Sequence, residues 1–277
     1  MKNDKIRKLE IAVVLLFVFF ALLIMIGRRF LNKEEEPPQE IIEENEPVID
    51  YSKIEVISGK YYYEDDNFSS SFGIDVSEFQ DDIDWKKVKE DGVEFVYLRI
   101  GRRGATTGLI YEDGKFLQNY EGVKQNGLKL GVYFFSQAKD EAEALEEAAW
   151  VKEHLKGKQI DLPIVYDCEE VILEDEPSRL DGIEKEQHTK NTIAFLEDMK
   201  KSGYDVMVYT YLYWADTYYD MEQISKYPIW FAQYDTEVPK LDWPISIWQY
   251  SNQGTINGIN EPTDLNIMFI RKNDRSE

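Results

Sequence analysis

Eight short apolar segments recur along the chain from residue 72 onward. They cover residues 72–76, 94–100, 129–136, 162–167, 205–211, 228–233, 245–250 and 265–270. Most are continuous rather than alternating, which is typical of strands covered on both faces. Helical patterns separate the first six, at residues 85–91, 116–125, 140–155, 184–201 and 214–225. Alternating strands and helices predict right-handed crossovers and a parallel sheet.

The connections change after the sixth segment. Residues 234–244 and 251–264 are polar, contain Pro or Gly, and show no helical period. The pattern therefore predicts a barrel of eight strands and about five helices, in which the last third has lost its helices. In such barrels, ligands bind at the carboxyl ends of the strands.

The first 71 residues follow a different pattern. Residues 11–27 are uncharged and mostly apolar, at the short end of the roughly 17–25 residues that span a bilayer. We expect a short cytoplasmic segment at 1–10, a transmembrane signal anchor at 11–27, an acidic disordered linker and lead-in at 28–71, and the barrel domain at 72–277. The alternative is secretion after cleavage, but the residues after the apolar run make a poor cleavage site.

The net charge, the single cysteine and the two histidines argue against several classes of function. A formal net charge of −22 argues against nucleic-acid binding, which needs a basic surface. Cys168 is the one cysteine, so no intrachain disulfide can form, and no Cys or His cluster has zinc spacing. We expect neither a metal nor another cofactor. His154 and His188 lie in charged, helix-like contexts, which disfavours Ser-His-Asp or Cys-His mechanisms.

Carboxylates stand where apolar strands end. Asp75 closes the first strand, and Asp167 and Glu169 follow the fourth, both on one side because side chains alternate along a strand. Carboxylates held together in a core repel one another, which suits paired acid chemistry with one group protonated and one charged. Glycoside hydrolysis needs such a pair. The abundant Tyr and Trp fit sugar binding, although an aromatic barrel core is the alternative.

Seven stretches, in the right order, resemble the glycoside hydrolase family 25 lysozymes, the Chalaropsis-type muramidases. They are Gly-Ile-Asp-Val-Ser (73–77), Gly-Val-Tyr-Phe-Phe (131–135), Val-Tyr-Asp-Cys-Glu (165–169), Val-Tyr-Thr (208–210), Ile-Trp-Phe-Ala-Gln-Tyr (229–234), Ile-Trp-Gln-Tyr (247–250) and Asp-Leu-Asn (264–266). The resemblance implies an α/β fold, an irregular (β/α)5(β)3 TIM-like barrel, here preceded by one N-terminal transmembrane helix. It also implies hydrolysis of the β-1,4 bond between N-acetylmuramic acid and N-acetylglucosamine in peptidoglycan.

The resemblance assigns roles to matching positions. Glu169 would be the general acid, Asp167 would orient or stabilise the reacting sugar, and Asp75 and Asp264 would complete an acidic floor. The substrate-binding candidates are Tyr133, Arg99, Tyr209, Trp230, Tyr234 and Trp248. Two positions depart from the family pattern: Phe134 stands where many members have His, and Cys168 separates the two acids and should point away from them.

We expect a monomeric, membrane-anchored bacterial enzyme, with its barrel outside the cytoplasm and peptidoglycan glycan strands as its partner. A non-catalytic, membrane-tethered wall-binding module is the alternative, and a membrane sensor is another. A chitinase-like hydrolase is disfavoured because its longer acidic motif is absent around Asp167. Asp264 precedes its strand, so a fully parallel barrel would leave it at the wrong rim. We therefore predict that the last strand runs antiparallel to the seventh.

Overall fold

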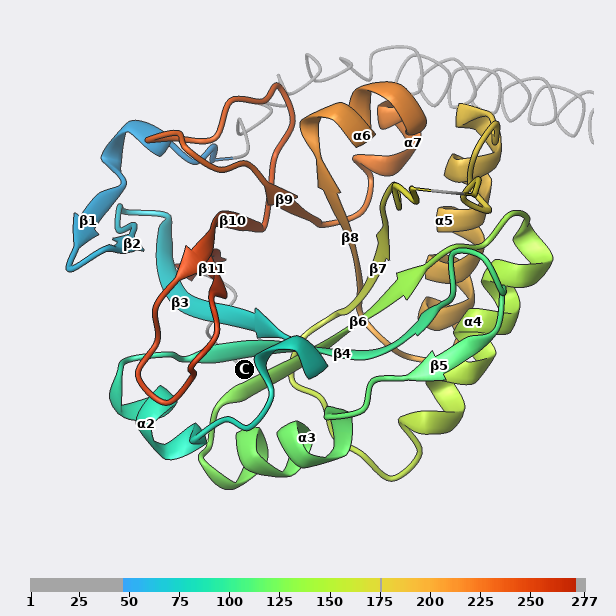
Figure 1. Ribbon diagram of the computed structural model, residues 1–277. Coiled ribbons are helices and arrows are strands. Elements are labelled where there is room, and N and C mark those ends of the chain that lie inside the picture. Colours follow the sequence, from blue (N-terminus) through green and yellow to red (C-terminus); the bar gives the residue numbers. More distant parts are fainter. Residues whose placement is uncertain (1–46, 175, 273–277) are drawn as a thin grey trace, which may run out of the picture. The chain divides into compact units, whose positions relative to one another are not determined.

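The computed structural model describes residues 47–174 and 176–272, which are built around one large β-sheet (Figure 1). Its strands are β3 (Phe68–Val76), β4 (Phe95–Arg103), β5 (Ile110–Glu112), β6 (Lys129–Ser136), β7 (Ile164–Cys168), β8 (Val206–Tyr211), β9 (Ile229–Ala232), β10 (Ile247–Gly254) and β11 (Thr263–Arg271). The order is β3-β11-β10-β9-β8-β7-β6-β4-β5, and β3 also pairs with β4. That extra pairing closes a barrel of eight strands, with β5 attached at the side of β4.

The direction of β11 sets it apart from its neighbours. The β3–β4, β4–β6 and successive pairings through β10 are parallel, whereas β11 is antiparallel to both β10 and β3. The predicted antiparallel last strand is thereby confirmed. Because β11 starts where β3 ends, Asp264 lies directly opposite Asp75 in the register.

Helices lie outside the sheet, and Figure 1 shows α3, α4 and α5 on its outer side. They are α2 (Trp85–Glu90), α3 (Phe116–Gln125), α4 (Glu141–His154), α5 (Lys185–Lys201), α6 (Leu212–Tyr218) and α7 (Met221–Ile224). Asp140 caps α4 by accepting a hydrogen bond from the Glu143 amide. The described residues also contain two short 3-10 helices, η1 (Tyr51–Lys53) and η2 (Glu78–Gln80).

The expected fold, a (β/α)5(β)3 TIM-like barrel behind a transmembrane helix, is wrong. A TIM barrel has eight parallel strands, each followed by a helix. This structure departs from that pattern in both its strands and its helices. The strand β11 is antiparallel to both neighbours, and β4 pairs with the antiparallel strand β5. The helices α2 and α7 have only six and four residues. The reason is local, because β10 and β11 are joined by the short loop 255–262, and so short a connection can join only antiparallel neighbours.

The membrane part of that expectation concerns residues that the structure does not describe. The predicted anchor at 11–27 lies outside the described residues, as does the linker up to residue 46. Within 47–174 and 176–272, no helix has both the length and the apolar character needed to cross a bilayer. Residues before 72 do contribute structure: β1 (Glu55–Ile57) and β2 (Lys60–Tyr62) form a hairpin, and β3 begins at Phe68.

The barrel has an interior core distinct from the outer core beneath the helices. Phe95, Tyr97, Val165, Met207, Tyr209, Trp230, Ala232 and Ile247 form the inner cluster. Two glycines make room for its rings, since a Cβ on Gly131 would lie 2.2 Å from the Tyr97 ring and one on Gly73 would lie 2.4 Å from the Phe95 ring. Aromatic rings therefore fill the barrel below the rim where the candidate residues lie.

Candidate active site

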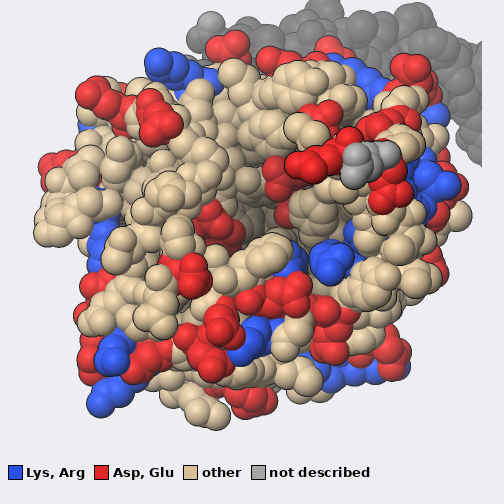
Figure 2. Space-filling model, viewed as in Figure 1, with Lys and Arg blue, Asp and Glu red and all other residues tan. Residues whose placement is uncertain are grey.

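A cleft of about 300 Å³ opens where β3 and β7 end and β11 begins. All four predicted acids line it: Asp75, Asp167, Glu169 and Asp264. Figure 2 shows a hollow on this face with acidic side chains inside it. Antiparallel β11 brings Asp264 to the same rim as Glu169, which is the arrangement predicted from its position before its strand.

Asp75 and Asp264 form the first pair. Asp75 is buried, and its Oδ2 accepts hydrogen bonds from Gln249 Nε2 (2.8 Å) and Asn266 Nδ2 (2.7 Å). Burial raises the pKa of Asp75 to about 6, although these amide donors favour its charged form. Burial and the neighbouring Asp75 charge raise the pKa of Asp264 to about 9. At neutral pH the negative charge therefore rests on Asp75 and the proton on Asp264.

Asp167 and Glu169 form the second pair. Burial, followed by the charges of Glu169 and Asp75, raises the pKa of Asp167 well above its usual range. Within the described residues, its Oδ1 has no hydrogen-bond partner. Burial raises the pKa of Glu169 to about 7, helped by the Asp75 charge and opposed by a hydrogen bond with Asp167. Desolvation is thus the larger cause, and the charge repulsion expected from the sequence adds to it. A carboxyl that titrates near neutrality is suited to general acid catalysis.

Five of the six predicted substrate-binding residues line the cleft: Arg99, Tyr133, Tyr209, Trp230 and Tyr234. Trp248 does not. It is fully buried in the outer core, lies edge-on to Tyr61, and donates from Nε1 to the Gln233 carbonyl at 2.9 Å. Side chains alternate along β10, so the residue that faces the cleft is its neighbour, Gln249.

The sequence prediction missed Gln249 and Asn266, which link the aromatic residues to the acids. The hydroxyls of Tyr209 and Tyr234 donate to Gln249 Oε1 at 3.0 and 2.6 Å. Trp230 Nε1 donates to Asn266 Oδ1 at 2.8 Å. Each amide thus accepts from an aromatic side chain and donates to Asp75. Strand alternation could have found Asn266, which stands two residues after Asp264 on the same strand.

Arg99 lines the cleft but is paired with two carboxylates. Its Nε donates to Asp113 Oδ2 (2.8 Å), and a terminal nitrogen bonds to Glu78 Oε1 (3.0 Å). Its guanidinium also lies 4.9 Å from the ring centre of Phe79. Phe79, which the sequence prediction also missed, is 72 % exposed and lines the cleft mouth. Arg99 therefore holds η2 in place through Glu78, and it packs against the Phe79 ring that lines the cleft.

Most of the chain matches one known protein family. Residues 74–259 match the family described as glycosyl hydrolases family 25. The chain belongs to glycosyl hydrolase family 25.

Two curated relatives have names that describe their activity. The chain is 32 % identical over 195 residues to an autolytic lysozyme of Clostridium acetobutylicum, an alignment that covers 70 % of this chain and 54 % of that protein. It is 28 % identical over 207 residues to lysozyme M1 of Streptomyces globisporus, with 70 % of this chain and 66 % of that protein covered. The chain thus spans about half the length of the clostridial relative.

Solved structures share the family 25 fold. The modular autolysin LytC from Streptococcus pneumoniae, in complex with a synthetic peptidoglycan ligand, superposes with a TM-score of 0.66 and 25 % identity, covering 78 % of this chain and 52 % of that one. The bacterial lysozyme from Streptomyces coelicolor gives a TM-score of 0.56 at 24 % identity, with 71 % and 90 % covered, and shows the fold alone.

The remaining expectations from the sequence concern residues outside the cleft. Cys168 is buried in the outer core, so it points away from the two acids as predicted. Neither His154 nor His188 lines the cleft, and burial lowers the pKa of His188 to about 4. Phe134 packs in the outer core as well. In the described part of the chain, no group of three or more His, Cys, Asp or Glu side chains could hold a metal ion.

Proposed function

We propose that this family 25 protein is a lysozyme that hydrolyses the β-1,4 bond between N-acetylmuramic acid and N-acetylglucosamine in peptidoglycan. The observation that carries the proposal is the convergence of four carboxyls in one cleft, with the Glu169 pKa raised to about 7. The names of the clostridial and streptomycete relatives, and the peptidoglycan ligand bound to LytC, support the same substrate class.

Each of the four acids would have a different role in catalysis. Glu169 would protonate the leaving oxygen, because its proton is available near neutrality. Asp167, beside it, would orient or stabilise the reacting sugar through the 2-acetamido group. Asp75, charged and fixed by Gln249 and Asn266, would stabilise positive charge that develops at the sugar, while Asp264 retains its proton.

Mass analysis of digestion products tests this proposal. The full chain is incubated with purified peptidoglycan, and the new reducing ends are reduced with borohydride and identified. A muramidase leaves N-acetylmuramic acid at each new reducing end. Reducing ends at N-acetylglucosamine would contradict the proposed bond. Sedimentation with peptidoglycan without any release of fragments would identify a non-catalytic wall-binding module instead.

We also propose that the uncharged segment 11–27 keeps the protein on the cell membrane, with the family 25 domain outside the cytoplasm. The length of the segment, its poor cleavage site and the location of peptidoglycan support this. Fractionation with an antibody to the C-terminus tests it. We expect full-length protein in the membrane fraction that external protease digests after wall removal. A shortened form in the medium would show cleavage and secretion.

A further inference from the structure

The backbone carbonyl of Glu169 is held by a buried side chain that the catalytic roles above do not use. Gln137, directly after β6, is fully buried, and its Nε2 donates to the Glu169 carbonyl at 2.9 Å. Glu169 lies one residue beyond the end of β7, where the sheet no longer fixes its backbone. The Gln137 amide supplies a hydrogen bond at the point where the strand ladder stops.

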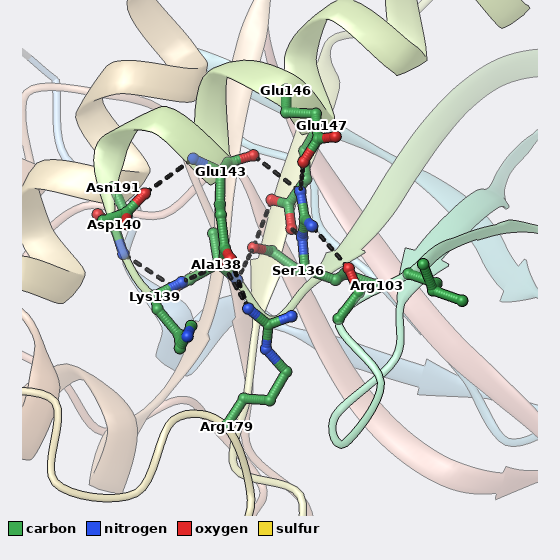
Figure 3. Close-up of polar contacts among 12 residues, drawn as sticks. Arg103, Ser136, Ala138, Lys139, Asp140, Glu143, Glu146, Glu147, Arg179 and Asn191 are labelled. Atoms are coloured by element: carbon green, nitrogen blue, oxygen red, sulfur yellow. Dashed lines mark hydrogen bonds and ion pairs between the residues drawn. The ribbon is translucent and has the colours of Figure 1, made fainter.

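The residues on either side of Gln137 are hydrogen-bonded, whereas its own Oε1 has no partner among the described residues. The Ser136 hydroxyl donates to Glu147 Oε2 at 2.6 Å and accepts from the Ala138 amide at 3.2 Å. Asn191 Nδ2, from α5, donates to the Ala138 carbonyl at 2.9 Å. Figure 3 shows Ser136, Ala138 and Asn191 near Glu147 of α4. The backbone of residues 136–138 is therefore tied to two helices, which leaves Gln137 little freedom.

A buried ion pair anchors this arrangement. Arg103 Nε donates to Glu147 Oε1 at 2.6 Å, with the Arg103 and Glu147 side chains 4 % and 0 % exposed. Arg103 also bonds to the Glu143 carbonyl (3.0 Å), and the Glu143 carboxylate accepts from Arg179 at 2.6 Å (Figure 3). Arg179 lies in the loop that follows Glu169. The end of β6 and the loop that follows Glu169 are thus both bonded to α4.

We propose that Gln137 is a positioning residue for Glu169: its amide fixes the Glu169 peptide so that the carboxyl points into the cleft. The inference rests on the proposed role of Glu169 as the acid. A displacement of about 1 Å at a reacting group can reduce the rate about 10²-fold. The loss of one neutral hydrogen bond costs only about 0.5–1.5 kcal/mol of stability. The effect on turnover should therefore exceed the effect on folding.

Gln137→Met tests this, because Met keeps the length of the side chain and removes the donor. We expect kcat for muropeptide release to fall at least about tenfold, with KM within about twofold. The basic limb of the pH profile should also move to lower pH, as a less confined Glu169 carboxyl becomes more hydrated. The matched control is Thr192→Val, which removes a fully buried hydroxyl bonded to the His188 carbonyl and should leave kcat unchanged.

A second variant keeps the inference testable should Gln137→Met fail to fold. In Gln137→Glu, a protonated carboxyl can donate to the Glu169 carbonyl, whereas an ionised one repels it. Its kcat relative to the wild type should therefore rise as the pH falls. A folded Gln137→Met with wild-type kcat, an equal loss in Thr192→Val, or a Gln137→Glu ratio independent of pH would overturn the inference. An inactive wild-type chain would instead overturn the proposed function.

Discussion

The pKa of Asp75 is raised much less than that of Asp264, which lies opposite it, and neighbouring amides contribute to the difference. Burial raises the pKa of Glu169 to about 7 and that of Asp264 to about 9, against about 6 for Asp75. Donors from β10 and β11 offset part of the desolvation of Asp75. One carboxyl is thus kept charged while others keep protons, which is the division of states that acid-catalysed glycoside cleavage requires.

The pH dependence of turnover should follow from these pKa values. We expect kcat/KM to fall as the pH rises through about 7, because Glu169 loses the proton that it must donate. It should also fall below about pH 6, where Asp75 becomes neutral. Initial rates of muropeptide release between pH 4 and pH 9 measure both limbs. A rate that stays constant to pH 9 would exclude a Glu169 that titrates near neutrality as the acid.

Asp264→Asn should stabilise the fold at neutral pH. The pKa of Asp264 rises from 3.8 to about 9 on folding, so between these values the folded chain holds a proton that the unfolded chain has lost. Stability therefore falls as the pH rises through this window, and a side chain that cannot ionise avoids that loss. We expect the free energy of unfolding to rise by about 1–3 kcal/mol at pH 7 and to be unchanged near pH 3.

Urea unfolding at the two pH values measures this effect. Asp242→Asn is the control, because Asp242 is exposed and its replacement should change stability by less than about 0.5 kcal/mol. Equal stability of Asp264→Asn and the wild type at pH 7 would show that folding does not raise the pKa of Asp264.

Among the elements, β6 and β4 depend on a glycine that faces a ring. Gly131→Ala would place a Cβ 2.2 Å from the Tyr97 ring. The ring is packed in the inner cluster, so it cannot shift without disturbing its neighbours. We expect a loss of about 1–3 kcal/mol in the free energy of unfolding, measured by urea denaturation. Adding Tyr97→Leu should recover part of the loss, since it removes the opposing ring. A strictly additive double variant would contradict this packing.

The elements also show what the sequence could and could not predict. All eight apolar segments correspond to strands of the barrel, because continuous burial leaves a clear local pattern. The short strands β1, β2 and β5 have half-buried or exposed side chains and gave no such pattern. The family resemblance assigned Trp248 to the cleft, whereas alternation along β10 turns it outward and brings Gln249 in.

For the whole molecule, the ordered motifs were sufficient to predict the family and the meeting of four acids at one rim, both of which the findings confirm. The overall fold was predicted wrongly. The antiparallel direction of β11 was predicted from the position of Asp264, but apolar periodicity reports burial and not which strands pair, so it did not show that β4 folds back onto β5 or that β11 closes the barrel against β3. That closure joins residues 264 and 75, which are far apart in the sequence, and completes the acidic cleft.

Glu169 is the proposed acid of a peptidoglycan-cleaving site. The most direct test compares Glu169→Gln with Glu170→Gln, its exposed neighbour, by kcat for muropeptide release. Gln keeps the shape of Glu but has no proton to transfer, and acid catalysis contributes about 10²–10⁴-fold. We predict that Glu169→Gln loses activity by that factor while remaining folded, and that Glu170→Gln behaves as the wild type. Wild-type release by Glu169→Gln would show that Glu169 is not the acid.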